Sequence, residues 1–272
     1  IVIRKDMLDK YGLSVPETID EWHTVLTAFK NQGVASPLSY DLLYWEKYYG
    51  VFMGAYGTKA DFYLKNGNAA YGYLEPEFKD GLNTLRQWYG EGLMDKNVVK
   101  IADLDSNILN SVTGASCVWA GSGIGKYLTA MKNKNSSFNL VPAPFPVINK
   151  GDRPKFGTKE KLLNVNNNAF ITSNCKNIEL AMRFLDYGYT DEGHMLFNFG
   201  IEGESYEIKN GNPVYTDLIL HNSDGLSMSE IMKKYMLSIF SGPFIQDERY
   251  IDQYYRYRQQ KDALNVWSKC DG

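Results

Sequence analysis

The stretch Phe197–Asp217, "FNFGIEGESYEIKNGNPVYTD", decides the fold because it joins a helical pattern to a hairpin pattern through a glycine-rich, acidic link. The helical run stops at Gly200, a natural end for a helix. Asn210 and Gly211 lie between apolar residues and are typical of a type I′ turn that joins two short strands. The link therefore has two interpretations, an acidic catalytic loop or a crossing point between two lobes.

The catalytic interpretation depends on Glu202 and Glu204. Glycoside hydrolysis needs two carboxylates that face each other across the sugar. These glutamates are adjacent on one extended segment, so their side chains lean the same way, whereas catalytic carboxylates usually come from separate elements. No metal-ligand spacing surrounds the histidines, which are His23, His194 and His221. We therefore expect no enzyme, no metal and no cofactor, and keep a glycan-active hydrolase as an alternative.

Strand-like and helix-like segments alternate along the chain. Thr18 and Glu21 have capping-box spacing and begin a helix. A strand is expected at 166–174, and helices at 228–240 and 247–267. This alternation predicts α/β layers around a mainly parallel sheet. Another amphipathic helix aligns four apolar side chains on one face: Phe78, Leu82, Leu85 and Tyr89.

Composition excludes several classes of protein. The net charge is −3 and the pI is near 5.7, which gives no basic footprint for nucleic acid. No run approaches the ~20 apolar residues of a membrane span. The cysteines number three and are widely spaced, which indicates neither a disulfide framework nor a zinc site, and Cys117 is expected to be a buried thiol in a strand. Because 14% of residues are aromatic, including 20 tyrosines with polar tips, we expect exposed surface lined with rings.

Two segments combine rings with backbone donors. In "WAGSGIGKY" Trp119 precedes glycines whose spacing differs from that of nucleotide-binding loops, and no Ser or Thr follows Lys126. A strand, a glycine-rich turn and a helix start leave backbone amides for a ligand, while a tight turn around a core tryptophan is the alternative. In "LLYWEKYY" the rings span too wide an arc for one buried helix face, so at least one should face solvent or a groove. These rings are Tyr44, Trp45, Tyr48 and Tyr49.

The segment "DLDSNILN" begins like a calcium loop, with Asp103, Asp105 and Asn107. The glycine required at the sixth position is Ile108, and the twelfth position is Gly114 rather than glutamate. We therefore expect a solvated helix start here and not a calcium site.

The order of five segments resembles the extracellular solute-binding proteins of ABC sugar importers, the family that includes the maltose-binding protein. The two most specific segments are "IVIRKDMLDKYGLSVPETIDEWHTVLTAFK" at 1–30 and "AMRFLDYGYTDEGHMLFNFGIEGESYEI" at 181–208. The others are "GLNTLRQWYGEGLMD", "GASCVWAGSG" and "NGNPVYT". The similarity covers residues 1 to about 220 and fades after that.

The resemblance implies an α/β fold of the type II periplasmic-binding-protein kind, with two lobes, a hinge and ligand bound in the cleft. In that family part of the first lobe precedes the segment like 1–30, so the first lobe should be only partly present in this chain. The implied division assigns 1–160 to the main part of the second (C-terminal) lobe and 161–200 to the returning part of the first lobe. Residues 201–272 would form the hinge crossing and the remainder of the second lobe.

The resemblance also implies site residues, with Gly200 and Gly203 absorbing the bend at the hinge. The ligand-binding residues implied are Tyr44, Trp45, Trp119, Gly121, Ser122, Gly123, Glu202 and Tyr206.

The implied function is the substrate-binding component of an ABC transporter. It would act as a monomer, capturing an oligosaccharide outside the cell and delivering it to the permease, without nucleic acid. The implied location is the cell surface, with a lipid anchor on an N-terminal segment outside this chain. A binder of a peptide or a sugar acid is the alternative, for which Lys126 and Arg153 are the nearby cations.

Overall fold

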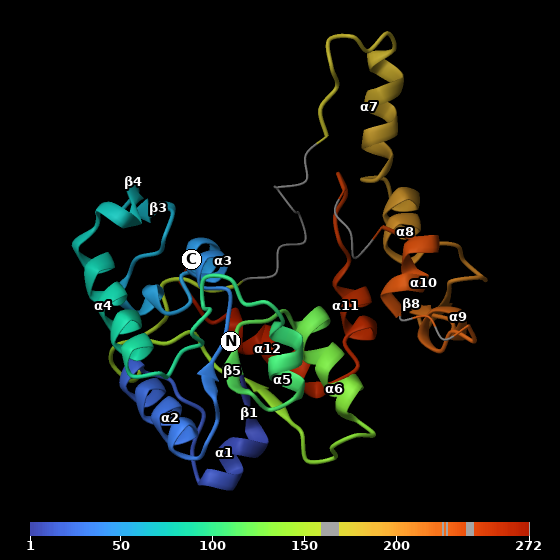
Figure 1. Cartoon of the computed structure of the whole chain (residues 1–272). Coiled ribbons are helices and arrows are strands. Elements are labelled where there is room, and N and C mark those ends of the chain that lie inside the picture. Colours follow the sequence, from blue (N-terminus) through green and yellow to red (C-terminus); the bar gives the residue numbers. More distant parts are fainter. Residues whose placement is uncertain (159–168, 225, 227, 238–241, 272) are drawn as a thin grey trace. The chain divides into compact units, whose positions relative to one another are not determined.

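The computed structural model of the chain (Figure 1) describes residues 1–158, 169–224, 226, 228–237 and 242–271. It divides into two compact units. Unit 1 comprises Ile1–Glu160 and Tyr257–Gly272, and unit 2 comprises Lys161–Arg256. The boundary expected after residue 200 falls inside unit 2, and the assignment of either unit to a lobe stays a prediction.

A four-stranded sheet in the order β2-β5-β1-β6 forms the centre of unit 1. β2 and β5 are parallel, but β1 is antiparallel to both of its neighbours. The expectation of a mainly parallel sheet is therefore wrong. β1 lies between two strands that come much later in the chain, and an alternation of helices and strands does not fix the direction of such a strand. The four strands are β1 Val2–Arg4, β2 Ser36–Leu38, β5 Thr113–Ser116 and β6 Leu140–Pro142.

The helices of unit 1 pack around this sheet through large aromatic side chains. α2 starts at the predicted capping box, where the Glu21 N–H donates to Thr18 Oγ1 at 3.2 Å and the Thr18 N–H donates to Glu21 Oε2 at 3.2 Å. Trp22 of α2 and Trp88 of α4 each meet Phe52 edge to face, at 5.4 and 5.3 Å between ring centroids. The α-helices are α1 Lys5–Tyr11, α2 Ile19–Asn31, α3 Leu42–Tyr49, α4 Pro76–Gly90, α5 Leu104–Leu109, α6 Lys126–Met131 and α12 Arg258–Trp267.

α12 (Figure 1) follows unit 2 in the chain but belongs to unit 1. There it packs against β6. The Trp267 Nε1–H donates to the Ile1 carbonyl at 3.1 Å and to the Ala143 carbonyl at 3.2 Å. Gln260, which is buried, donates from Nε2 to the Ala120 carbonyl at 2.9 Å. This last helix therefore completes the core of unit 1.

α4 buries a face that matches the expected one only in part. Gly81, Leu85 and Trp88 are buried, whereas Leu82 and Tyr89 are 49% and 48% exposed. Near the start of α4, the hairpin of β3 Phe62–Lys65 and β4 Asn68–Tyr71 forms a separate two-stranded sheet, and short 3-10 turns cover Met53–Tyr56 (η1) and Gly72–Leu74 (η2).

Unit 2 contains the stretch that links helix to hairpin. The predicted type I′ turn is confirmed, because Lys209 pairs with Asn212 and both turn residues have positive φ, 52° at Asn210 and 77° at Gly211. The elements of unit 2 are α7 Ile178–Tyr187, α8 Asp191–Phe199, β7 Tyr206–Lys209, β8 Asn212–Tyr215, α9 Asp217–Leu220, α10 Met228–Tyr235 and α11 Glu248–Tyr254.

Three expected elements differ in extent. The strand at 166–174 begins outside the described residues, and its described part, 169–174, is not a strand. α10 ends at Tyr235. The single helix expected at 247–267 is two helices, because the chain is extended at Tyr255, with φ −88° and ψ 101°. Within the described ranges, no helix combines the length and the apolar character that a membrane crossing requires.

Candidate functional site

Five aromatic side chains gather in unit 1, four from α3 and one from the end of the segment that follows β5. α3 begins where the Asp41 carboxylate accepts the Tyr44 N–H at 3.0 Å, and it ends at Gly50 in the left-handed conformation. β2 and β5 are paired in parallel, so the segments that leave them emerge at the same edge of the sheet. We call the five residues the ring cluster: Tyr44, Trp45, Tyr48, Tyr49 and Trp119.

The ring cluster has a buried base and exposed rims. Trp45 is 7% exposed and lies 5.1 Å from Trp119 between ring centroids, at 44°. Tyr49 meets Trp119 edge to face at 5.5 Å. The exposed fractions of Tyr44, Tyr48 and Trp119 are 38%, 51% and 42%. Three rings of the cluster are therefore exposed, while Trp45, one of the implied ligand-binding residues, is buried against Trp119.

The glycine-rich turn after β5 is a single π-helical turn, η3, over Ala120–Gly125. The N–H groups of Gly123 and Ile124 donate to the Trp119 carbonyl at 3.0 and 3.1 Å. The expected free amide at Gly123 is therefore already bonded. Gly123 is also packed so closely that an added Cβ would lie 2.5 Å from Val118 Cβ. Ser122 is exposed and Gly121 is half-buried, so this part of the turn remains open to a ligand.

The helix that carries four of these rings, α3, also holds a buried carboxylate. Glu46 is 2% exposed and directly follows Trp45 in α3. Its carboxylate accepts hydrogen bonds from Tyr40 Oη at 2.9 Å, from the Phe52 N–H at 3.1 Å and from the Met53 N–H at 3.0 Å. Burial raises the pKa of Glu46 to about 7, although these three donors act in the opposite direction. Glu46 thus ties α3 to Tyr40, just after β2, and to the turn that follows α3. Sequence reasoning missed this role.

The other expected site residues belong to unit 2. Glu202 is exposed, whereas Tyr206 is 5% exposed and packs against Phe199 at 5.9 Å between ring centroids. Burial, together with the nearby Glu202, raises the pKa of the Tyr206 hydroxyl. The Tyr206 ring is therefore part of the unit 2 core, and only its hydroxyl end is near a polar neighbour.

Gly200 and Gly203 shape a tight loop inside unit 2, at φ 87° and 81°. Ser205 fills this loop: its Oγ donates to the Phe199 carbonyl at 2.7 Å and accepts the Ile201 N–H at 2.7 Å. The hinge role of the two glycines stays a prediction, as do the ligand contacts of the other site residues.

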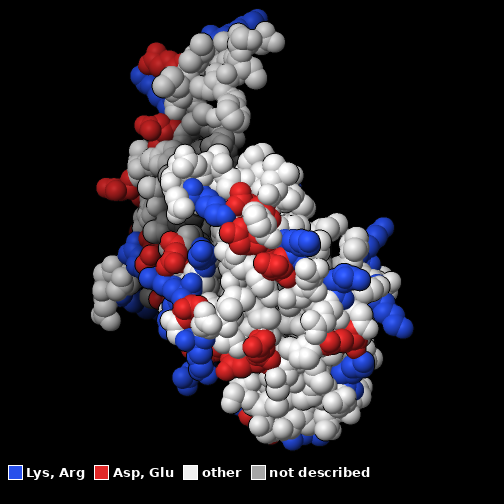
Figure 2. All heavy atoms as spheres, turned by 90° about the vertical axis from the view of Figure 1, so that its left-hand side faces the viewer, with Lys and Arg blue, Asp and Glu red and all other residues white. Residues whose placement is uncertain are grey.

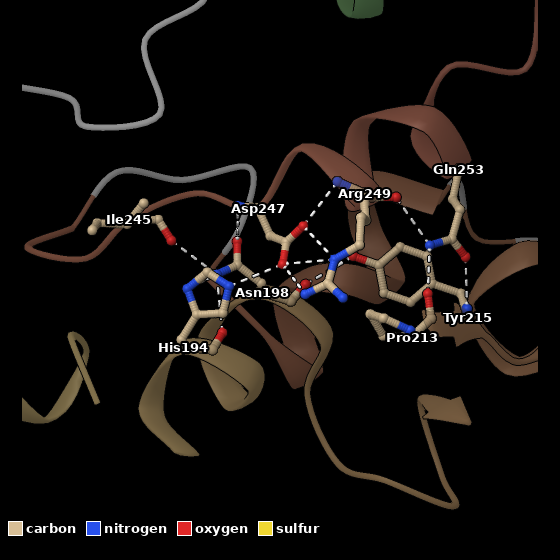
Figure 3. Close-up of polar contacts among 8 residues, drawn as sticks. All are labelled: His194, Asn198, Pro213, Tyr215, Ile245, Asp247, Arg249 and Gln253. Atoms are coloured by element: carbon tan, nitrogen blue, oxygen red, sulfur yellow. Dashed lines mark hydrogen bonds and ion pairs between the residues drawn. The ribbon is translucent and has the colours of Figure 1, made fainter. Parts of the chain in front are cut away.

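A polar network in unit 2 joins α8 to the start of α11 (Figure 3). His194 Nε2 lies 2.9 Å from Asp247 Oδ2, and Arg249 Nε donates to Asp247 Oδ1 at 2.9 Å. Buried Asn198 accepts the Asp247 N–H and donates to the Ile245 carbonyl, both at 2.9 Å. Burial alone would raise the pKa of Asp247, but the hydrogen bonds from Arg249 and His194 outweigh it and hold the pKa at about 2. This network fixes the local structure, since all of its groups are bonded to one another.

The carboxylates of the calcium-like segment, Asp103 and Asp105, form hydrogen bonds and an ion pair with other residues of unit 1. Asp103 caps α5 by accepting the Ser106 N–H at 2.9 Å, and Asp105 accepts from Tyr127 Oη at 2.6 Å and pairs with Lys126. Nowhere in the part of the chain that the structure describes do three His, Cys, Asp or Glu side chains come together as metal ligands would.

Similar proteins are known for most of this chain. It is 25% identical over 266 residues to "Lipoprotein LipO" of Bacillus subtilis (strain 168), which spans 92% of this chain and 52% of LipO. It is 26% identical to the "Fructooligosaccharide ABC transporter substrate-binding protein FusA" of Streptococcus pneumoniae serotype 4, over 74% of this chain and 38% of FusA. The chain thus spans about half the length of LipO and less of FusA.

Among solved structures, the "alginate-binding protein AlgQ2" superposes with a TM-score of 0.71 at 25% identity, over 98% of this chain and 56% of AlgQ2. This neighbour confirms the type II periplasmic-binding-protein-like α/β fold. The family model described as "Bacterial extracellular solute-binding protein" matches residues 1–195. The chain therefore belongs to the family of bacterial extracellular solute-binding proteins.

Proposed function

We propose that this protein is the substrate-binding component of an ABC transporter, which captures an oligosaccharide outside the cell and delivers it to the permease. The observation that carries the proposal is the ring cluster, because three exposed rings lie together where the paired strands β2 and β5 end. Flat aromatic faces suit the apolar faces of sugar rings, and the open part of η3 adds polar groups for hydroxyls. Family membership and the name of FusA support the same role.

The remaining parts of the proposal extend this role to the whole protein. Ligand would bind between two lobes that close about Gly200 and Gly203, with Glu202 and Tyr206 bonding hydroxyls and without chemical change to the sugar. The protein would act as a monomer at the cell surface, held there by a lipid anchor. The name of the relative "Lipoprotein LipO" supports this anchor.

A sugar acid is the second candidate ligand, because AlgQ2 is named for binding alginate. The two cations singled out for it are already in ion pairs, Lys126 with Asp105 and Arg153 with Asp271 at 3.2 Å. On the face of unit 1 that carries α2 and α4, acidic and basic groups form small separate patches within a broad uncharged surface (Figure 2). Because both of these cations are already paired, the neutral oligosaccharide is the preferred ligand.

Calorimetry of the full-length protein against neutral and uronate oligosaccharides tests the proposal. We expect binding to a neutral glycan, and a Trp119→Ala variant should bind it at least about tenfold more weakly, which is ~1.4 kcal/mol. Tyr189→Ala is the matched control, because Tyr189 is 47% exposed and belongs to unit 2. Binding of a peptide but of no glycan would refute the sugar role. Turnover of a chromogenic glycoside that is lost in Glu202→Gln would support the hydrolase instead.

A further inference from the structure

A groove of about 540 Å³ lies along α4 in unit 1. One wall is the α4 face that carries Leu82, Leu85, Arg86 and Tyr89, and the other is the segment 94–100. These α4 residues have the i, i+3, i+4, i+7 spacing of a single helical stripe. The sequence pattern predicted most of this stripe to be core, yet the fold leaves Leu82 and Tyr89 about half exposed.

The groove is apolar at its base and positively charged at its edge. Leu85 is buried and contributes to the base, and Val99 in the facing segment is 62% exposed. The charged lining residues are Arg86, Lys96 and Lys100, all of them basic, and within the described parts of the chain none of them is in an ion pair. This local positive charge contrasts with the net charge of −3 for the whole chain.

We propose that this groove docks an acidic amphipathic helix of a partner protein. An exposed apolar stripe beside a facing segment is the geometry with which a groove receives the apolar face of a helix. The distance along α4 from Leu82 to Tyr89 is about two helical turns, or ~10 Å, so two turns of the incoming helix can be covered.

The basic edge and the apolar base of the groove favour an acidic amphipathic helix over other ligands. Carboxylates on the flanks of the incoming helix would meet the three unpaired cations, whereas a basic helix would be repelled. A glycan fits less well, because the buried part of the lining consists of the apolar side chains Leu85, Met94 and Val98, which offer its hydroxyls no hydrogen-bond partners. The inference does not depend on sugar binding by the ring cluster, so either can fail alone.

The test measures fluorescence anisotropy of a labelled helical peptide of about 15 residues mixed with the full 272-residue chain, without sugar. The probe has leucines at i, i+3, i+4 and i+7 and glutamates on both flanks. We expect saturable binding that weakens at least about tenfold with Leu82→Glu and with the paired change Lys96→Glu and Lys100→Glu. Leu74→Glu is the control, because Leu74 is 81% exposed and does not line the groove.

Further readouts separate the proposed occupant from others. A peptide with lysine in place of glutamate should bind at least about tenfold more weakly, and NaCl raised from about 0.05 to about 0.3 M should weaken the glutamate peptide. Tryptophan fluorescence during unfolding shows whether each variant is folded. Equal binding of the two peptides, or binding that Leu82→Glu leaves unchanged, overturns the proposal. Binding of dodecanoate or self-association that requires Leu82, without binding of the glutamate peptide, also overturns it.

Discussion

Glu46 makes the stability of unit 1 depend on pH in the direction opposite to that of most carboxylates. Its pKa is raised from 4.5 to about 7 in the folded chain, because the carboxylate is buried. The folded state therefore holds a proton that the unfolded chain has released. Between about pH 4.5 and pH 7, folding takes up this proton, so the free energy of unfolding falls as the pH rises.

The size of the effect follows from the same two values. The difference between 4.5 and about 7 corresponds to about 3 kcal/mol, since one pH unit is ~1.4 kcal/mol. In Glu46→Gln the side chain has a similar shape but cannot ionise, so this dependence should be absent. Relative to the variant, the original chain should lose about 3 kcal/mol of stability as the pH rises from about 4.5 to about 7.

Urea unfolding followed by tryptophan fluorescence isolates this effect. All five tryptophans, Trp22, Trp45, Trp88, Trp119 and Trp267, belong to unit 1, so the signal reports that unit. All other ionisable side chains are the same in the two proteins, so their contributions cancel in the difference. The compared quantity is the free energy of unfolding of the original chain minus that of Glu46→Gln. The reasoning is refuted if this difference changes by less than about 0.5 kcal/mol from about pH 5 to about pH 8, or if it rises with pH.

Three further outcomes follow from packing and charge. Trp45→Ala should destabilise unit 1 by ~3–5 kcal/mol and Trp119→Ala by far less, because only the first ring is buried; equal shifts in urea unfolding would contradict this. Gly200→Ala should lower the hydrogen-exchange protection of unit 2 more than Gly203→Ala does, since both have positive φ but only at Gly200 would the new Cβ lie 2.4 Å from Ser205 Oγ. The pKa of Asp247 falls from 3.8 to about 2 on folding, so its ionised carboxylate stabilises unit 2 above about pH 4. Circular dichroism should show this stabilisation being lost towards pH 2 in the original chain, whereas Asp247→Asn should show no such loss.

Features encoded by neighbouring residues could be predicted from the sequence. The capping pair Thr18 and Glu21 and the turn Asn210-Gly211 both form as expected, because their geometry depends on a few adjacent residues. The excess of aromatic residues likewise indicated exposed rings, and Trp119 is such a ring.

Features that depend on distant residues could not be predicted in this way. The contact between Trp45 and Trp119 requires β2 and β5 to be neighbours, and the bond between His194 and Asp247 joins residues 53 positions apart. The hydrogen bonds of Glu46 likewise depend on how the chain returns after α3. In each case the short-range pattern is compatible with several long-range pairings.

The position of α12 has a consequence for synthesis on the ribosome. Residues of unit 2 are made before this helix, yet the side chains of Trp267 and Gln260 complete hydrogen bonds of unit 1. Unit 1 therefore cannot complete its fold until unit 2 and then α12 have left the exit tunnel. Until then, the surface of β6 that α12 covers stays open to solvent. A factor that shields apolar surface on nascent chains would act on unit 1 during this interval.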